Sequence, residues 1–552
     1  MTTPQNKICT DCKSDFIIDS GDLILYEKIG LVLPKKCFEC RLKHYLAFWI
    51  FGKFRKGKSD LTGENFITVL PAKLRYPVYT SHEWWGDAWD GLDFGQDYDS
   101  TRSFFDQLKE LQEKIPRPHQ TGENNVNSDW CDDVWESKNC YLSRSVVKCE
   151  NLSYGYRVVE AKDSFDIVNS FNLQNSYSCF ACHNSFNLNF SENSKDCIDS
   201  YFLFDCRNCQ NCFMSYNLRN KQYCIRNKQY TKEDYEKELK NIKLDSYQTI
   251  ESLKHEFEEI LKNQAVHKEN FNLKTTDSTG NYMTNCDKCS QVFSWENGQN
   301  CRNSMRGIGT KDCIDQVGTW RNENSGSNAC GLGGYQMKYS SWSDSRYSEY
   351  LDLCMECEYC FGCVGLKKKK YCILNKQYAK EEYETLKEQI ITDMKNSGEY
   401  GKFLPYSLSL GEYNLSQNII FFQNMKKEEV IEKGGYWSEE DLSSNDGIPS
   451  LDLPDSILEI KPEISAQALI CPETHYRFNI APTEYEFHKR KSFALPRVHY
   501  DMRIIKKARK VAVFKSYPYK CFYCKKYIMA YYPPEWGYQK IACEECYKQN
   551  IA

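Results

Sequence analysis

The chain has no long apolar run, although it contains 552 residues. Its longest apolar stretch, residues 45–51, is far shorter than the roughly 20 residues that a membrane-spanning helix needs. The opening residues also lack the apolar core of a secretory signal peptide. We therefore expect a soluble, cytoplasmic protein with no membrane partner.

Net charge and catalytic signatures are scarce as well. The formal charge is −4, so any binding of nucleic acid requires a local basic patch. The sequence contains no P-loop, no Gly-x-Gly-x-x-Gly after a predicted strand, no Gly-x-Ser-x-Gly and no His-Glu-x-x-His. We predict no small-molecule substrate, and catalysis stays an open but disfavoured hypothesis.

One carboxylate-rich segment is the only candidate for catalysis. A hydrolase could use such side chains as general acid and base, but nothing in the sequence fixes their spacing. An aromatic plug beside the first Cys-rich unit is the favoured interpretation. The candidate residues are His82, Glu83, Asp87, Asp90 and Asp93.

Cysteine, by contrast, is abundant, with 29 residues in two different patterns. Towards both ends the cysteines form separated Cys-x-x-Cys pairs, whereas in the middle they recur among serines and aromatics. In a chain expected to remain in the cytoplasm, these groups favour metal thiolates and reduced thiols over a disulfide framework.

The terminal pairs predict two structural zinc sites. Zinc prefers four sulfur or nitrogen ligands in a tetrahedron, and each Cys-x-x-Cys turn supplies two sulfurs. Four protein ligands leave no position for a substrate, so we expect about two structural Zn²⁺ ions per chain. A redox Cys-x-x-Cys and an iron–sulfur site are the alternatives. The predicted ligands are Cys9, Cys12, Cys37, Cys40, Cys521, Cys524, Cys543 and Cys546.

A related unit at residues 466–515 has lost most of these ligands. Cys471 lies 462 residues after Cys9, and Phe478 and Arg503 continue the match at the same spacing. The other three ligand positions hold Thr474, His499 and Met502. We expect this degenerate unit to fold without metal, with weak binding by its Cys and His as the alternative.

The central cysteines belong to a repeat that occurs twice. Aromatic residues recur every 15 positions from Tyr141 to Tyr216, which is typical of a β-solenoid whose coils stack as parallel strands. Nearly identical phrases end the two copies at residues 223–230 and 371–378, so the chain carries an internal duplication. Because Ser and Cys alternate within one column, we interpret these cysteines as stacked interior thiols, with metal ligation and disulfides as alternatives.

Basic and aromatic residues follow the second Cys-x-x-Cys pair. Basic side chains there could contact phosphate while Tyr45, Phe48, Trp49 or Phe54 stack on bases; the alternative is a helix with a solvated basic face. Further basic runs occur at 367–370, 488–491 and 506–510. The candidate nucleic-acid-binding residues are Arg41, Lys43, Lys53, Arg55, Lys56 and Lys58.

Residues 7–41 resemble the probable treble-clef zinc-ribbon family. The resemblance rests on both Cys-x-x-Cys pairs, on Tyr26-Glu27-Lys28-x-Gly30 and on Leu33-Pro34. The whole chain is similar to large Cys-rich repeat proteins of small-genome uncultured bacteria, whose repeats end in the Asn-Lys-Gln-Tyr phrase seen here at 227–230 and 375–378. The resemblance implies zinc at Cys9, Cys12, Cys37 and Cys40, and implies no established activity.

Together these patterns predict a multidomain, mainly β protein with treble-clef zinc ribbons at both ends and two short duplicated β-solenoids of 15-residue coils, each followed by helices. The preferred function is non-catalytic binding of RNA or DNA through the zinc units and basic helices, with the solenoids as a spacer. The alternatives are a protein-interaction scaffold and a hydrolase that uses the carboxylates of residues 82–93. The predicted segments are a zinc ribbon at 1–60, a Trp/Asp-rich segment with a helix at 61–130, solenoids at 131–230 and 285–378, a helical cap at 231–284, a helix and linker at 379–465, the degenerate unit at 466–515 and a zinc ribbon at 516–552.

Overall fold

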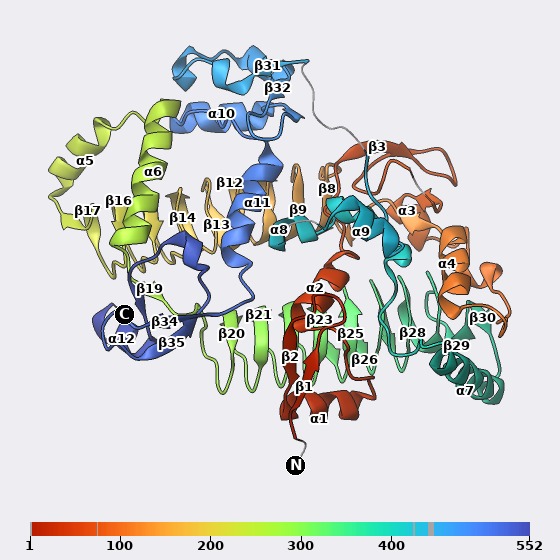
Figure 1. Cartoon of the computed structure of the whole chain (residues 1–552). Coiled ribbons are helices and arrows are strands. Elements are labelled where there is room, and N and C mark those ends of the chain that lie inside the picture. The colour runs from red at the N-terminus through yellow and green to blue at the C-terminus, as the bar shows by residue number, and fades with distance from the viewer. Residues whose placement is uncertain (1–2, 74, 423–424, 440–445, 552) are drawn as a thin grey trace. The chain divides into compact units, whose positions relative to one another are not determined.

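The computed structural model describes residues 3–73, 75–422, 425–439 and 446–551 (Figure 1). The chain divides into two compact units. One unit comprises residues 1–120 and 271–438, and the other comprises residues 121–270 and 439–552. The N-terminal Cys-rich segment therefore belongs with the second repeat, and the C-terminal segments belong with the first repeat. No sequence signal indicated this pairing.

Residues 121–230, called here the first ladder, form short strands that pair in parallel with the next coil of the chain. Phe171 pairs with His183, and Phe186 pairs with Ile198. The last strand turns back in an antiparallel hairpin. The strands are β7 (Gly122–Glu123), β8 (Cys131–Trp135), β9 (Ser143–Val147), β10 (Glu150–Ser153), β11 (Tyr156–Val159), β12 (Lys162–Phe165), β13 (Val168–Gln174), β14 (His183–Asn189), β15 (Ile198–Phe204), β16 (Gln210–Tyr216), β17 (Gln222–Ile225) and β18 (Lys228–Gln229).

The step from one coil to the next is twelve residues, so the predicted 15-residue coil was wrong. Left-handed backbone recurs at every third residue, for example at Asn169 (φ 48°) and Asn172 (φ 52°), which divides each coil into three-residue sides. Residues 15 apart lie one coil and one side away from each other, so the spacing of the aromatics suggested too long a coil. Asn and Asp tolerate left-handed backbone better than most residues, which accounts for their frequency here.

The interior of the first ladder is built from one residue of each three. Ser170 Oγ accepts a hydrogen bond from the Cys182 N–H (3.1 Å) and donates to the Val168 carbonyl (2.8 Å). Cys182 Sγ donates in the same way to the Phe180 carbonyl (3.4 Å). A hydroxyl and a thiol thus donate to equivalent backbone carbonyls, each two residues earlier in the chain, which explains why Ser and Cys share a column.

Residues 271–378, the second ladder, repeat this arrangement. Most steps are twelve residues, but Asp344 pairs with Met355, one residue short of a full coil, and the register shifts there. Its terminal hairpin pairs Cys372 with Gln377 as the first ladder pairs Cys224 with Gln229, which confirms the duplicated ending. The strands are β20 (Gly280–Thr284), β21 (Ser290–Glu296), β22 (Arg302–Ile308), β23 (Ile314–Trp320), β24 (Asn322–Glu323), β25 (Gly326–Ala329), β26 (Gly333–Tyr335), β27 (Asp344–Arg346), β28 (Met355–Phe361), β29 (Lys370–Ile373) and β30 (Lys376–Gln377).

A helix follows each ladder, as the sequence predicts. Thr231 caps α5 (Lys232–Lys240) by accepting a hydrogen bond from the Asp234 N–H (3.1 Å). The helix expected within residues 61–130 is α4, which Ser103 caps. The other helices outside the terminal segments are α4 (Phe104–Lys114), α6 (Tyr247–Asn263), α7 (Lys380–Asn396), α8 (Asn418–Phe421) and α9 (Lys427–Glu432).

Four antiparallel hairpins, each followed by a helix, make up the terminal segments. Two hairpins lie near the N-terminus. The basic helix expected after Cys40 is α2, which ends at Leu46, whereas the basic residues of Arg55–Lys58 lie on a strand. The N-terminal elements are β1 (Gln5–Ile8), β2 (Asp15–Ile18), α1 (Ser20–Ile29), α2 (Phe38–Leu46), β3 (Arg55–Lys58), β4 (Asn65–Thr68), β5 (Val78–Tyr79), α3 (Ser81–Trp85) and β6 (Arg117–Pro118). The C-terminal elements, with the short strand β19 that pairs with them, are β19 (His267–Lys268), β31 (Ile448–Pro449), β32 (Leu469–Ile470), β33 (Arg477–Phe478), α10 (Pro482–Lys491), α11 (Tyr500–Val511), β34 (Tyr517–Lys520), β35 (Tyr527–Ala530), β36 (Ile541–Ala542) and α12 (Glu544–Asn550).

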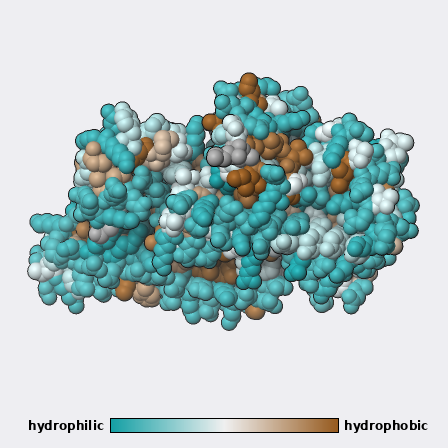
Figure 2. All heavy atoms as spheres, turned by 90° about the horizontal axis from the view of Figure 1, so that it is seen from below, coloured by the Kyte–Doolittle hydropathy of each residue, from teal (hydrophilic) through white to brown (hydrophobic). Residues whose placement is uncertain are grey.

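The surface is largely polar. Figure 2 shows that hydrophilic residues cover most of the visible face and that hydrophobic residues gather in separate small clusters. Among the helices of the described ranges, none has the length and apolar character needed to cross a bilayer.

Candidate metal centres

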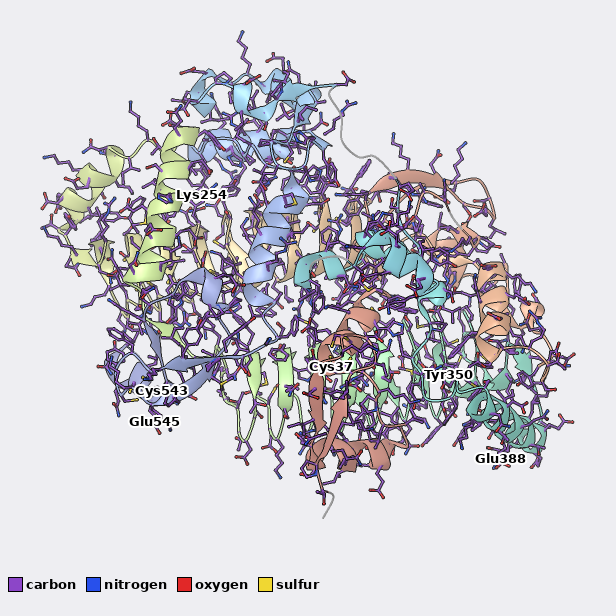
Figure 3. The ribbon with its side chains drawn as sticks, in the orientation of Figure 1. Cys37, Lys254, Tyr350, Glu388, Cys543 and Glu545 are labelled. Carbon is purple, nitrogen blue, oxygen red and sulfur yellow. The ribbon has the colours of Figure 1, made fainter. Side chains whose placement is uncertain are left out.

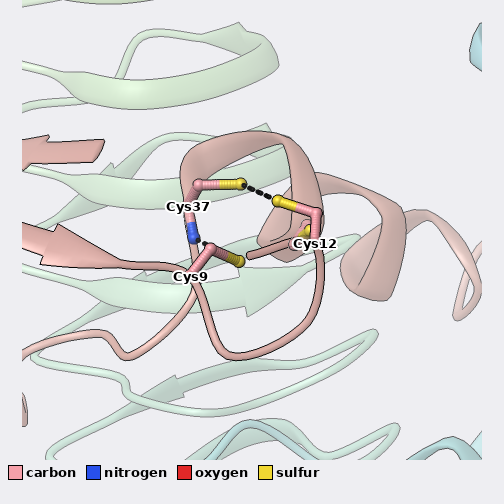
Figure 4. Close-up of side chains that lie close together, drawn as sticks. Cys9, Cys12 and Cys37 are labelled. Atoms are coloured by element: carbon pink, nitrogen blue, oxygen red, sulfur yellow. Dashed lines mark hydrogen bonds between the residues drawn. The ribbon is translucent and has the colours of Figure 1, made fainter. Parts of the chain in front are cut away.

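The four N-terminal cysteines converge on one point. Cys9 and Cys12 lie in the turn between β1 and β2, Cys37 is the N-cap of α2, and Cys40 lies in the first turn of that helix. All four sulfurs lie within 4.8 Å of one another. The sulfurs of Cys12 and Cys37, which a dashed line joins in Figure 4, are 3.7 Å apart. We call this group the N-terminal tetrad.

Backbone hydrogen bonds shape this turn for thiolates. Lys13 takes left-handed backbone (φ 62°), and its N–H donates to the Cys9 carbonyl (3.0 Å). The Cys37 N–H donates to Cys9 Sγ (3.3 Å; Figure 4). A hydrogen bond from the Cys40 thiol lowers the pKa of Cys37 to about 5. The same hydrogen bond raises the pKa of Cys40, so within this pair Cys37 is the sulfur that is held in the ionised form that binds metals.

The C-terminal cysteines repeat this geometry. Cys521 and Cys524 lie in the turn between β34 and β35, and Cys543 is the N-cap of α12 (labelled in Figure 3). The Cys543 N–H donates to Cys521 Sγ (3.4 Å), and the sulfurs of Cys524 and Cys543 are 3.9 Å apart. With Cys546, these residues form the C-terminal tetrad, whose sulfurs also lie within 4.8 Å of one another.

These two tetrads are the only groups in the described ranges that bring three or more potential metal ligands so close together. All eight predicted ligands are thus in place. Four sulfurs around one point can hold a metal ion such as zinc, and they would complete its coordination without a position for a substrate. The arrangement suits a structural metal rather than a catalytic one.

The degenerate unit keeps the turn but not the ligands. The His499 N–H donates to Cys471 Sγ (3.4 Å), as the third Cys does to the first in both tetrads. However, His499 Nδ1 accepts a hydrogen bond from the Asp501 N–H (3.1 Å), so this ring nitrogen caps α11. The local fold therefore persists where the metal-binding set has been lost.

The ladder thiols have a different environment. Burial raises the pKa of Cys149 to about 12, and its sulfur donates to the carbonyls of Val147 (3.4 Å) and Val158 (3.6 Å). Such a group remains a neutral thiol at neutral pH and is a poor metal ligand. The hydrogen bonds support the interpretation of these cysteines as stacked interior thiols.

Two sets of ladder cysteines interact with one another, namely Cys206, Cys209 and Cys212 in the first ladder and Cys354, Cys357 and Cys360 in the second. Hydrogen bonds from the Cys354 and Cys360 thiols lower the pKa of Cys357 to about 4. The Cys354 and Cys357 thiols nevertheless also contact the carbonyls of Cys363 (3.3 Å) and Leu366 (3.5 Å). These three cysteines lie on successive three-residue sides of one coil, and they are not among the groups whose ligand atoms all lie within 4.8 Å of one another.

Arg41, a predicted nucleic-acid contact, lies inside the fold. It is 9 % exposed, and its guanidinium donates to Asp315 of the second ladder at 3.0 and 2.8 Å. Tyr45 is buried too, and its hydroxyl lies 3.1 Å from Ser327 Oγ. The interpretation of Arg41 as a phosphate contact was therefore wrong, because α2 packs this face against the ladder.

Of the other residues predicted to contact nucleic acid, some bind partners within the protein and others are exposed to solvent. Lys43 pairs with Glu39 (2.9 Å), and Arg55 donates to the Leu70 carbonyl (2.7 Å). Lys53 is half-buried, whereas Lys56 and Lys58 project from β3 into solvent. The predicted patch thus reduces to two exposed lysines.

Two of the other basic runs, at 367–370 and 506–510, are partly paired with carboxylates. Lys369 contacts Asp90 (2.5 Å), Lys370 contacts Glu358 (2.7 Å), and Lys510 contacts Glu192 (2.6 Å). In the run at 488–491, Lys489 and Lys491 donate instead to the backbone carbonyls of Ile457 (3.4 Å) and Asn175 (3.0 Å). The positive charge of two of the three runs is thus partly balanced by carboxylates, which weakens the case for a polyanion.

The carboxylates of residues 82–93 are used separately. Glu83 accepts hydrogen bonds from Ser59 Oγ (2.5 Å) and Thr62 Oγ1, whereas Asp90 pairs with Lys369. His82 and Asp87 are exposed. No acid–base pair forms from these residues, so their geometry gives no support to the hydrolase hypothesis.

The sequence did not reveal what binds Arg41 and its counterpart Arg503. In the other compact unit, Arg503 pairs with Asp166 (2.5 Å) of the first ladder and with Glu484 (3.1 Å). Both aspartates, Asp166 (φ 58°) and Asp315 (φ 56°), occupy left-handed positions of a ladder coil. Each unit therefore joins one hairpin–helix segment to one ladder through an equivalent buried ion pair.

Comparison with known proteins gives no match to a family or to a curated protein. The similarity to treble-clef zinc ribbons remains a prediction, and the geometry described above carries the functional argument.

Proposed function

We propose that the chain is a non-catalytic scaffold, stabilised by two structural zinc ions, that binds a protein partner on one face of the second ladder. The zinc ions would lie in the N-terminal and C-terminal tetrads. Because each tetrad is closed, zinc would stabilise the local fold and leave recognition to other surfaces.

A column of tyrosines on the second ladder carries this proposal. Tyr347 and Tyr359 stack with ring centroids 4.8 Å apart, and Tyr359 and Tyr371 stack at 5.3 Å. Tyr347 is 37 % exposed, and Tyr359 and Tyr371 are half-buried. We call Tyr347, Tyr359 and Tyr371 the tyrosine stack.

Alternating charges accompany the tyrosine stack. Arg346 pairs in the ladder with Glu358, and Glu358 pairs with Lys370, each residue directly preceding one of the tyrosines. Lys370 also forms an ion pair with Glu358 (2.7 Å). The ladder thus presents rigid aromatic edges beside polar groups of both signs.

This surface suits protein better than nucleic acid. The rings cover one another's faces at these spacings, so a base cannot insert between them, and their edges and hydroxyls remain for contact. Tyrosine is enriched at protein interfaces because it offers a large area with few rotatable bonds and a polar end. Mixed neighbouring charges also disfavour a polyanion.

The pairing supports the finer fold interpretation as well. Coils that stack in parallel at steps of twelve residues, with small residues inside, are what a β-solenoid requires. A hairpin turn with two cysteines, followed by a helix whose first turn holds two more, is the arrangement expected of a zinc ribbon.

Binding of nucleic acid is the second candidate, and the exposed Lys56 and Lys58 on β3 favour it. Two lysines would give weak binding with a shallow dependence on salt, since the slope scales with the number of phosphates that are neutralised. Replacing both with Glu should abolish such binding if it exists.

Affinity capture with the full chain tests the proposal. We expect the wild type to retain one protein in stoichiometric amount, and Tyr347→Ser/Tyr359→Ser/Tyr371→Ser to lose it. Tyr527→Ser removes a 75 % exposed tyrosine of β35 and serves as the control that keeps the partner. Capture of nucleic acid that Lys56→Glu/Lys58→Glu abolishes, or capture unaffected by the triple substitution, would overturn the scaffold.

A further inference from the structure

The hairpin of β3 and β4 closes in the same way as the hairpin of the N-terminal tetrad. The Ser59 N–H donates to the Glu64 carbonyl (2.8 Å), and the Gly63 N–H donates to the Ser59 carbonyl (2.9 Å). In the tetrad, Cys9 and Lys13 make the corresponding bonds at 2.9 and 3.0 Å. Left-handed backbone follows the second ligand position in both turns, at Gly63 (φ 78°) and at Lys13 (φ 62°).

Four side chains then stand where a tetrad has cysteines. Ser59 and Thr62 keep the spacing of the first pair, and Thr80 and Glu83 keep the spacing of the second pair. Thr80 is the N-cap of α3, as Cys37 is the N-cap of α2.

The link between the two pairs is shared as well. In each segment, the residue that follows the first ligand position donates its backbone N–H to a carbonyl. That carbonyl belongs to the residue two before the third ligand position. Asp60 donates to Val78 (2.9 Å), Thr10 to Lys35 (3.0 Å) and Phe522 to Ile541 (2.7 Å). The segment at residues 55–86 therefore has the backbone of a ribbon without its cysteines.

The Glu83 carboxylate binds the same positions that a metal would bind. Its oxygens accept hydrogen bonds from Ser59 Oγ (2.5 Å), from Thr62 Oγ1 and from the Thr80 N–H (2.7 Å). A glutamate reaches further from its backbone than a cysteine, so its charged end lies among the other three positions. Partial burial opposes ionisation, but the hydrogen bonds from Ser59, Thr62 and Thr80 lower the pKa of Glu83 to about 2.

The match extends over a pair of segments. β3 (Arg55–Lys58) and β4 (Asn65–Thr68) lie 462 residues before β34 and β35, and α1 (Ser20–Ile29) lies 462 residues before α10. This is the spacing that separates Cys9 from Cys471. Both N-terminal segments thus have counterparts near the C-terminus, in the same order.

We propose that the chain carries two copies of a tandem ribbon pair, at residues 5–86 and 467–550. Each copy has kept one metal-binding member. In the metal-free member at residues 55–86, the Glu83 carboxylate replaces the metal. The inference rests on the proposed binding of zinc by the two tetrads. The retained member is the first of the N-terminal pair and the second of the C-terminal pair.

Restoring the ligands tests this replacement. The full chain with Ser59→Cys/Thr62→Cys/Thr80→Cys/Glu83→Cys should bind three zinc ions, whereas the wild type and the control Glu83→Cys should bind two. A wild type without zinc would refute the zinc proposal itself. A wild type with two ions and a folded quadruple variant that also holds two would overturn the inference.

A second measurement applies if the quadruple variant fails to fold. Glu83→Ala in the otherwise native chain should speed hydrogen exchange of the amides of residues 59–64 and 80–84 by at least about tenfold, since hydrogen bonds to a charged group are lost. Zinc content should not change. Unaltered exchange in both stretches would show that the carboxylate does not hold this segment together.

Discussion

The buried ion pair between Arg41 and Asp315 should contribute strongly to the stability of its compact unit. The two side chains are 10 % and 3 % exposed, and two guanidinium nitrogens of Arg41 contact the same carboxylate oxygen. Asp315→Asn keeps the shape of the side chain and tolerates the left-handed backbone at this position. It removes the charge that compensates Arg41.

The expected loss follows from leaving a cation buried without its partner. Breaking such a pair on one side typically costs about 3–5 kcal/mol. A loss of this size should lower the urea midpoint of the unit by roughly 1–2 M. Tryptophan fluorescence of the full chain can follow it, because most tryptophans, including Trp49, Trp84 and Trp295, belong to the unit that contains Asp315.

Asp312, which lies three residues before Asp315 on the neighbouring side of the ladder, provides a matched control. Asp312 pairs with Lys28 of α1 (3.0 Å), but Lys28 is 47 % exposed. Asp312→Asn should therefore cost less than about 1 kcal/mol, as exposed pairs do. Equal midpoint shifts for the two substitutions would refute the view that α2 is anchored to the ladder by a buried charge pair.

Two further predictions concern the other unit. Cys182 lies between Ser170 and Ser194 in one interior column, so Cys182→Ser should keep the hydrogen bond to the Phe180 carbonyl and change the free energy of unfolding by less than about 1 kcal/mol. Cys182→Leu should instead overpack the column and cost about 1–3 kcal/mol. Thermal unfolding distinguishes the two variants, and equal losses of stability would contradict the shared role of hydroxyl and thiol. Burial, and then the charge of Arg503, lowers the pKa of His488 to about 4, so the neutral ring stabilises the fold fully above pH 6.5, and about 3 kcal/mol should be lost as the pH falls from 6.5 to 4. His488→Gln should flatten this part of the stability curve, and an unchanged slope would contradict the assignment.

The two groups of four cysteines could be predicted from sequence because Cys-x-x-Cys pairs act locally. Each pair fits one turn or one helix start, so spacing alone identified Cys9, Cys12, Cys37 and Cys40. The ladder was harder, because a period of three residues produces matches at 12 and at 15. Only the hydrogen-bonded register, such as that of Phe171 with His183, fixes the length of the coil.

The remainder depended on contacts between distant parts of the chain. Arg41 belongs to a basic run, but its partner Asp315 lies 274 residues away, so the sequence could not show that its charge is buried and neutralised. The segment that holds Ser59 and Glu83 went unrecognised because none of its four ligand positions is a cysteine. Its one available signal was the spacing of 462 residues, which the match of Cys9 with Cys471 had already shown.

Zinc content per chain tests the central claim most directly, namely that eight of the 29 cysteines bind metal and the ladder cysteines do not. Native mass spectrometry of the full chain should show two zinc ions, with one lost in Cys12→Ser and the other lost in Cys524→Ser. Cys354→Ser/Cys357→Ser should retain both ions. A chain without zinc, a third ion lost with the ladder cysteines, or bound iron would contradict the account.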